Sequence, residues 1–204
     1  MTTRVDAVSQ TRQRIVEATV RLHGQNGIFG TSWKDIAREA EVAVGTVYKH
    51  FPSLDELVPA CGELLMQRIE PPSPEDAANI IGDATDVRER LLRVTTALFA
   101  FYDRGGNHLE NDLRERALPA VREWEQYQRD TIIHFLRTAL GADTKLDDRL
   151  RLAAAVLDFR SYSAMRAHGL EPATAAEQVT AMIASCLERV EAGNPVVAKA
   201  TADI

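Results

Sequence analysis

Apolar residues recur at helical spacing along most of the chain, and no stretch shows the strict alternation of a half-buried strand. Glycine and proline separate the periodic segments. The predicted helices cover about 9–25, 33–40, 44–51, 54–69, 86–104, 107–117, 119–140, 147–168 and 172–192. Between and around them, we expect a loose arm at 1–8, a proline-rich connector at 70–84 and a frayed tail at 193–204. The pattern predicts an all-α protein of about nine helices.

The segment 31–51 predicts two short helices joined by a tight turn. Ser32 is a good N-cap residue for the first helix, and the turn falls at Glu41-Val42-Ala43. Pro52 ends the second helix after about two turns. A helix this short needs neighbours to be stable, and its outer face is left free. This arrangement is typical of a helix-turn-helix unit, which places its second helix in the major groove of DNA.

Side chains on the outer face of this unit suit contact with DNA. Gly45 lets the backbone approach closely, while Tyr48 and Lys49 suit phosphate oxygens. Thr46 can reach a phosphate or a base edge, and methyl groups can contact thymine. The predicted DNA-binding residues are Ser32, Lys34, Ala43, Val44, Gly45, Thr46, Tyr48, Lys49 and His50. The alternative is a plain helical hairpin whose Tyr48 and His50 lie at the edge of the core.

The segment from Thr11 to Leu57 resembles the N-terminal part of the TetR family of bacterial transcriptional regulators. Gly45-Thr46-Val47-Tyr48-Lys49-His50-Phe51-Pro52-Ser53 is similar to the family's most specific signature, and Leu54-Asp55-Glu56-Leu57 resembles the entry to its fourth helix. The resemblance implies an all-α homodimer with an N-terminal DNA-binding domain and a C-terminal ligand and dimer domain. We therefore expect a helix-turn-helix domain at 1–53, a linking helix at 54–69, an effector-binding and dimerisation domain at 70–192, and the tail at 193–204.

Two residues depart from the family pattern. Glu41 stands where the family commonly has glycine, so the turn is expected to hold Glu41 with a positive φ. Leu54 stands where the family often has a lysine that reaches a DNA phosphate. One backbone contact is therefore in question.

The fourth predicted helix carries two local signals. Ser53 and Glu56 form a candidate capping box at its start. Pro59 lies inside it and is expected to kink the helix or to make it start late. Because this helix links the two domains in the family, Pro59 is either a hinge or a static bend.

Charge and cysteine content refine the picture. The net charge is −6, but residues 1–58 carry seven basic and seven acidic side chains, so the acidic excess lies beyond them and should face away from DNA. Neither a signal peptide nor an 18-residue apolar run is present, which predicts a cytoplasmic protein without a membrane span.

Cys61 and Cys186 are interpreted as buried free thiols, with a redox switch or disulfide as the alternative.

The last two long predicted helices are rich in alanine, so they can approach other helices closely. Two such helices from each subunit can form a four-helix bundle with a partner, and the family resemblance implies that arrangement. A dimer would read two half-sites of a palindromic double-stranded operator about one turn apart. The alternative is packing within one chain only.

The family resemblance implies a cavity for an unknown small-molecule effector in the C-terminal domain. The candidate ligand-binding residues are polar or aromatic residues on apolar faces: His108, Trp124, Tyr127, His134, Arg160 and Tyr162. Each of them alone also fits a core-edge or surface role. If Arg160 is buried, it needs an anionic partner such as Glu125, Asp158 or a ligand carboxylate. On that condition we predict a mostly apolar ligand with one acidic group.

No catalytic residue, metal site or cofactor is predicted, because the five histidines lack metal-ligand spacing and no phosphate loop or nucleophile elbow is present. Three functions remain open. The first is a ligand-responsive dimeric repressor, and the second is a regulator that works without a ligand or as an activator. The third is a helical protein-interaction module with a vestigial helix-turn-helix.

Overall fold

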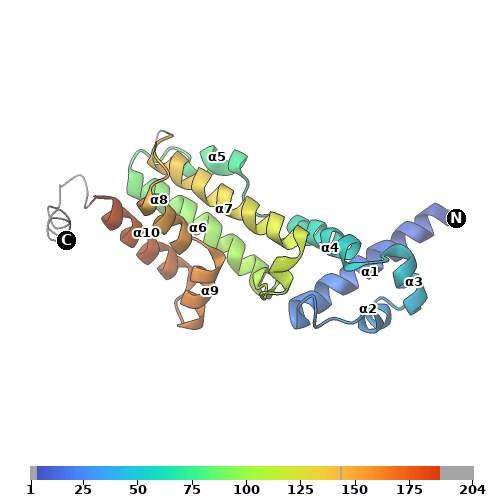
Figure 1. The fold of residues 1–204 in the computed structure, drawn as a ribbon. Coiled ribbons are helices and arrows are strands. Elements are labelled where there is room, and N and C mark those ends of the chain that lie inside the picture. The colour runs from blue at the N-terminus through green and yellow to red at the C-terminus, as the bar shows by residue number, and fades with distance from the viewer. Residues whose placement is uncertain (1–3, 143, 189–204) are drawn as a thin grey trace, which may run out of the picture. The chain divides into compact units, whose positions relative to one another are not determined.

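The structure, a computed structural model, describes residues 4–142 and 144–188, and all regular secondary structure in these ranges is helical (Figure 1). The α-helices are α1 Arg4–Asn26, α2 Trp33–Glu39, α3 Val44–His50, α4 Leu54–Ile69, α5 Ala77–Ile81, α6 Val87–Gly105, α7 Pro119–Leu140, α8 Asp148–Val156, α9 Phe159–Ala167 and α10 Pro172–Glu188. Three 3-10 helices accompany them: η1 Pro74–Asp76, η2 Gly106–Leu109 and η3 Glu115–Ala117. The all-α prediction is confirmed for the described residues.

The chain forms two compact units, and both draw on the long helices α6 and α7. The first unit comprises Met1–Pro71 and Phe101–Gln128, and the second comprises Pro72–Ala100 and Arg129–Ile204. The predicted boundaries at residues 53, 69 and 192 divide the chain by function, which compactness does not assign, so they stay a prediction. The predicted tail at 193–204 lies outside the described residues.

The core of the first unit is built on the inner face of α1. Ile15, Val16 and Val20 from α1 pack with Val47 from α3 and Leu57 from α4, and all five are buried. The same cluster also holds Ala18, Ile36, Ala37, Ala40, Phe51 and Cys61. The two-turn helix α3 is therefore stabilised by tertiary packing rather than by its own length.

Helix α1 begins at Arg4, so the predicted loose arm at 1–8 is wrong from residue 4 onward. The segment contains no glycine or proline, and Asp6 in the first turn suits the positive end of the helix dipole. The Thr11 hydroxyl donates to the Ala7 carbonyl at 2.9 Å, which is a bond between successive turns of this helix. The end of α1 agrees with the prediction: Gly27 follows it with φ 74°.

Helix α4 begins at Leu54 and runs through Pro59 to Ile69, so it does not start late. Ser53 occupies the N-cap position, but its side chain makes no capping hydrogen bond, so the predicted capping box is wrong. Whether Pro59 acts as a hinge stays a prediction.

The predicted helix at 147–168 is broken into α8 and α9. Asp158 caps α9 by accepting a hydrogen bond from the Arg160 backbone N–H at 3.0 Å. Aspartate competes for backbone N–H groups and therefore favours caps over helix interiors. The spacing of apolar residues continues across Asp158, so it predicted one helix where the structure has two.

Two further segments differ from the prediction. The expected connector at 70–84 contains η1 and α5, and a capping box between Ser73 and Asp76 starts η1. The expected helix at 107–117 is instead two 3-10 helices. Asp112 accepts hydrogen bonds from the N–H groups of Arg114 and Glu115 at 2.7 and 2.8 Å, which holds a turn at this point.

The second unit packs around α6, α7, α8 and α10. Its buried residues include Leu91, Leu98, Phe135, Leu150 and Val179. Phe99 and Tyr162 meet with ring centroids 4.8 Å apart. Within the ranges the structure describes, none of the helices combines the length and apolar character required to cross a membrane.

Candidate functional site

The turn between α2 and α3 is closed by backbone hydrogen bonds around Glu41. Its φ is 54°, as predicted from its place in the turn. The N–H of Val42 donates to the Ala37 carbonyl at 3.0 Å, and the N–H of Glu41 donates to the Arg38 carbonyl at 3.2 Å. These two bonds satisfy the last carbonyls of α2 in a Schellman arrangement. Glu41 therefore accepts the geometry that the family usually gives to glycine.

The start of α2 is fixed by Ser32. Its hydroxyl oxygen accepts a hydrogen bond from the Asp35 N–H at 3.2 Å and donates to the Asp35 carboxylate at 2.5 Å. The Ser32 hydroxyl holds the pKa of Asp35 below its usual range, and the Arg38 guanidinium, paired with Asp35 at 2.5 Å, adds to this effect. The Ser32 side chain thus caps the helix, whereas Lys34 beside it is exposed.

The two faces of α3 differ sharply. Val47 is fully buried in the core, while Tyr48 is 47% exposed and Lys49 is exposed. The Tyr48 ring stacks on Trp33 of α2 with centroids 4.9 Å apart, which limits the orientations open to the tyrosine. A Cβ placed on Gly45 would meet no atom within 4 Å. On the outer face of α3, another molecule can therefore approach the backbone at Gly45.

The other predicted contact residues line the edge of this face. Ala43 is exposed, while Val44, Thr46 and His50 are half-buried, and Val44 also packs on the core cluster. Their contacts with DNA stay predictions. Leu54, the second departure from the family pattern, also packs against the core cluster. At position 54, a leucine that packs against the core thus stands where the family often has a lysine.

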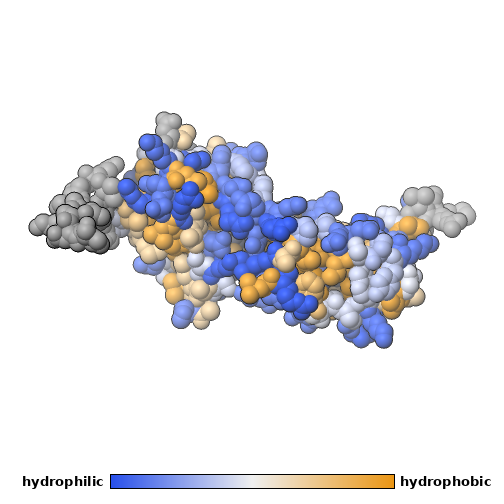
Figure 2. All heavy atoms as spheres, in the orientation of Figure 1, coloured by the Kyte–Doolittle hydropathy of each residue, from blue (hydrophilic) through white to orange (hydrophobic). Residues whose placement is uncertain are grey.

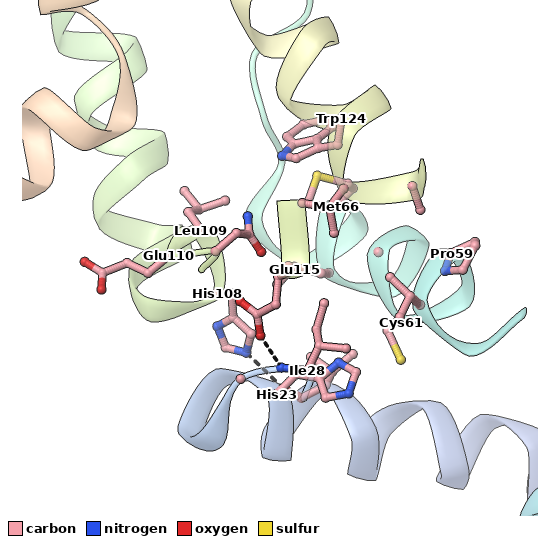
Figure 3. A pocket seen from close by; sticks show the side chains of 18 of the residues that line it. His23, Ile28, Pro59, Cys61, Met66, His108, Leu109, Glu110, Glu115 and Trp124 are labelled. Carbon is pink, nitrogen blue, oxygen red and sulfur yellow. Dashed lines mark hydrogen bonds between the residues drawn. The ribbon is translucent and has the colours of Figure 1, made fainter. Parts of the chain in front are cut away.

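A cavity of about 260 Å³ lies in the first unit, between the C-terminal part of α1, helix α4, the segment 107–115 and the start of α7. We call it the α1–α4 cavity. Its walls include Val20, His23, Ile28, Val58, Pro59, Cys61, Met66, His108, Leu109, Glu115, Val121 and Trp124. Figure 3 shows Trp124 and Met66 on one side, His23 on the other, and Glu115 between them.

Contacts distant in sequence hold one wall of this cavity together. The Glu115 carboxylate accepts hydrogen bonds from the N–H groups of Ile28 at 2.5 Å and Asp112 at 2.8 Å. The His108 Nε2 lies 3.1 Å from the Val20 carbonyl oxygen (Figure 3). A Cβ on Gly24 would lie 2.4 Å from that nitrogen, so glycine is required for the histidine to approach α1.

Two titratable side chains of the cavity wall are neutral at pH 7. Burial lowers the pKa of His23 from 6.5 to about 4, and His108 contributes a smaller electrostatic effect in the same direction. The His23 Nε2 is buried and has no hydrogen-bond partner among the described residues. Burial likewise raises the pKa of the Cys61 thiol to about 12. Cys61 is a buried free thiol as predicted, whereas Cys186 is only half-buried.

The buried His23 predicts a pH-dependent loss of stability. Its pKa of about 4 lies below the unfolded value of 6.5, so below pH 6.5 the unfolded chain binds the proton first and stability falls as the pH falls. Between pH 7 and 5 this group should lower the free energy of unfolding by about 2 kcal/mol. Urea titrations should show a weaker pH dependence for His23→Leu than for the unaltered protein. Equal slopes would contradict a buried neutral imidazole.

The six candidate ligand-binding residues do not form one site. His108 and Trp124 line the α1–α4 cavity. Tyr127 is exposed and stacks on Trp124, with centroids 5.7 Å apart. His134, Arg160 and Tyr162 lie in the second unit, where Tyr162 is buried and the other two are exposed. The premise that Arg160 is buried is wrong, so the acidic ligand predicted from it has no support.

His23 and Glu115, two polar residues of the cavity wall, were absent from the predicted set. His23 follows Val16 and Val20 at helical spacing, a signal that places it on the inner face of α1. Glu115 had no comparable signal, because its partner Ile28 lies 87 positions away in the sequence. In the described part of the chain, no three metal-binding side chains gather into a candidate metal site.

Comparisons with known proteins agree with this geometry. Residues 15–61 match the family model of bacterial regulatory proteins, tetR family. The HTH-type transcriptional regulator AcrR of Shigella flexneri is 36% identical over 86 residues, which are 42% of this chain and 40% of AcrR. The chain thus spans about two fifths of that curated relative's length.

Solved structures are similar over more of the chain. A transcriptional regulator from Rhodococcus has a TM-score of 0.61 at 18% identity and covers 87% of this chain and 96% of its own. The multidrug binding protein EbrR, complexed with imidazole, has a TM-score of 0.56 at 26% identity and covers 84% of this chain and 93% of its own. Residues 15–61 thus match the TetR family model, and the likeness to solved regulators extends over most of the chain. The relatives named here are regulators rather than enzymes.

Proposed function

We propose that this protein is a homodimeric transcriptional repressor that a small-molecule ligand releases from its DNA operator. The observation that carries the proposal is the α2–α3 unit, in which a buried Val47 holds the helix while Gly45, Tyr48 and Lys49 face outward. The match of residues 15–61 to the TetR family model supports the same function. The same match supports a cytoplasmic site of action, where the operator would be available.

The outer face of α3 suits the surface of a duplex. Gly45 allows the helix backbone to come close to the DNA, and Lys49 supplies a charge for a phosphate. Tyr48 is held by Trp33 at 4.9 Å, so its hydroxyl loses little orientational freedom on binding a phosphate oxygen. Few groups are left to read bases, mainly Thr46 and the methyl groups of Ala43 and Val44.

So small a reading surface favours a dimer, since two recognition helices would read two half-sites of a palindromic operator. The helices proposed to pair are those at the end of the chain. Leu152 on α8 is 55% exposed and Met182 on α10 is 51% exposed. Figure 2 shows hydrophobic residues reaching the surface over the region that α8 and α10 occupy in Figure 1. Association of two subunits there would remove this apolar surface from water.

Control by a ligand is supported by the packing around the α1–α4 cavity. Val20 and Cys61 line the cavity and also belong to the core cluster that contains Val47 of α3. A ligand that displaces either residue alters the packing beneath the recognition helix. The ligand can release DNA only to the extent that it binds the non-DNA-binding form more tightly.

The DNA interface can be tested with one charge removed from α3. Lys49→Ala should weaken binding to an operator selected from random duplexes by at least about tenfold, because a phosphate contact is lost. The slope of log K against log salt should become shallower by about 2, one for each subunit of the dimer. Fluorescence anisotropy of labelled duplex measures both quantities.

The matched control is Lys145→Ala, which removes the same charge from an exposed residue of the second unit. It should change neither the affinity nor the salt slope. Tyr48→Phe should weaken binding less than Lys49→Ala, since only the hydroxyl is lost. Unchanged operator binding by Lys49→Ala, with circular dichroism as for the unaltered chain, would exclude α3 as the DNA-reading helix.

A further inference from the structure

The α1–α4 cavity combines apolar walls with one buried carboxylate. Apolar side chains make up about half of its lining, with Trp124 from α7 as the aromatic member. Glu115 is only 5% exposed and faces the cavity between His23 and Met66 in Figure 3. All these residues belong to the first unit. The cavity therefore offers a ligand both dispersion contacts and a localised negative charge.

The Glu115 carboxylate has acceptor capacity left for a ligand. Each of its oxygens accepts one backbone N–H, from Ile28 and from Asp112, and each oxygen has a second lone pair. No salt bridge of Glu115 occurs within the described ranges, and the neighbouring Arg116 pairs with Glu125 at 3.3 Å. A buried carboxylate without a cation nearby is costly, so a positive charge placed beside it is favoured.

The charges of the other lining residues also favour a cationic ligand over an anionic one. No lysine or arginine lines the cavity in the described part of the chain. Of the other two acidic lining residues, Glu63 is exposed, and Figure 3 shows the Glu110 side chain directed away from the cavity centre. Glu115 is therefore the buried acidic side chain of the cavity. An anionic ligand would meet Glu115 with no basic side chain to offset the repulsion.

Trp124 adds an aromatic contact to this set. An indole face attracts a cation through its quadrupole, most strongly where water is excluded.

We infer that the α1–α4 cavity binds a compact, mostly apolar molecule with one positive charge, its ammonium group facing Glu115 and its apolar body against Trp124 and Met66. Ligand cavities commonly measure about 300–1,000 Å³, so 260 Å³ suits a molecule of one or two rings. The inference rests on the proposed function in one respect: it takes the bound molecule to be the effector.

Direct binding without DNA tests the site separately from the regulatory role. Isothermal titration at pH 7.4 compares three probes of similar size: protonated N,N-dimethylbenzylamine, neutral benzyl alcohol and anionic phenylacetate. We expect the cation to bind most tightly and phenylacetate most weakly. Glu115→Gln should weaken binding of the cation by at least about tenfold, the size of one charge-assisted contact.

Two further variants keep the test decisive. Trp124→Leu alters the aromatic wall but leaves the hydrogen bonds of Glu115 in place. It should lower the affinity for the cation by about threefold to tenfold. Glu123→Gln removes the same charge as Glu115→Gln from an exposed position on α7 and should leave binding unchanged. If phenylacetate binds as tightly as the cation, if no probe binds, or if Glu123→Gln matches Glu115→Gln, the inference is overturned.

The effect on DNA is measured afterwards with the selected operator. Cation binding that depends on Glu115 but leaves operator retention intact would support the site and contradict ligand release. Release of the operator by phenylacetate alone, without cation binding, would support the proposed function and overturn the inference about this cavity.

Discussion

Replacing Gly45 with leucine is expected to abolish specific operator binding while leaving the protein as stable as before. A Cβ at this position meets nothing within 4 Å, so the free protein has room for the new side chain. Leucine also has a higher helix propensity than glycine, by roughly 0.8 kcal/mol, which favours α3. In the complex, the same side chain would occupy the space into which the duplex must come. The affinity should fall at least about a hundredfold, toward the non-specific level.

Anisotropy with the selected operator and urea unfolding together test this prediction. Gln67→Leu adds the same side chain at an exposed position of α4 and should leave operator binding unchanged. A Gly45→Leu protein that retains the operator would show that this face of α3 does not approach DNA. A protein that loses both stability and binding would show that Gly45 serves the fold instead.

Replacing Phe51 with alanine is expected to lower the free energy of unfolding by about 3–5 kcal/mol, the usual loss for a buried phenylalanine. Phe51 is 1% exposed and belongs to the core cluster beneath α3. The Arg12 guanidinium carbon lies 4.7 Å from its ring centroid, so an arginine–aromatic contact is lost as well. Because α3 depends on this core, operator binding should fall together with stability.

The matched control is Phe29→Ala, which deletes the same side chain at a position that is 37% exposed. Arg114 lies over this ring as Arg12 lies over Phe51, at 4.4 Å, so the two sites differ mainly in burial. We expect Phe29→Ala to cost less than about 1.5 kcal/mol. Equal losses in urea unfolding followed by the fluorescence of Trp33 and Trp124 would argue against a core centred on Phe51.

Elements whose ends are marked by local chemistry were predicted well. Ser32 caps α2 through its own side chain, and Pro119 begins α7 with a φ that already suits a helix. The αL residue Gly27 ends α1. These signals act within about one helical turn, so the sequence displays them directly.

Elements whose ends depend on competing interactions were predicted poorly. Asp158 could lie in the middle of one long helix or cap a second one, and apolar spacing does not distinguish the two. The segment 107–117 forms 3-10 turns because Asp112 and Glu115 capture backbone N–H groups, one of them from Ile28. The contribution of Ile28 cannot be recognised from the local sequence.

The sequence by itself determined the helical class, the recognition unit and its outward residues, since periodicity, caps and breakers operate between neighbours in the chain. Only the tertiary structure decided that Trp124 and His108 share a cavity with His23 and Glu115, while Arg160 is exposed in the other unit. The reason is separation along the chain: the Ile28–Glu115 hydrogen bond joins residues 87 positions apart. Such contacts are set by how whole helices pack, which no local pattern records.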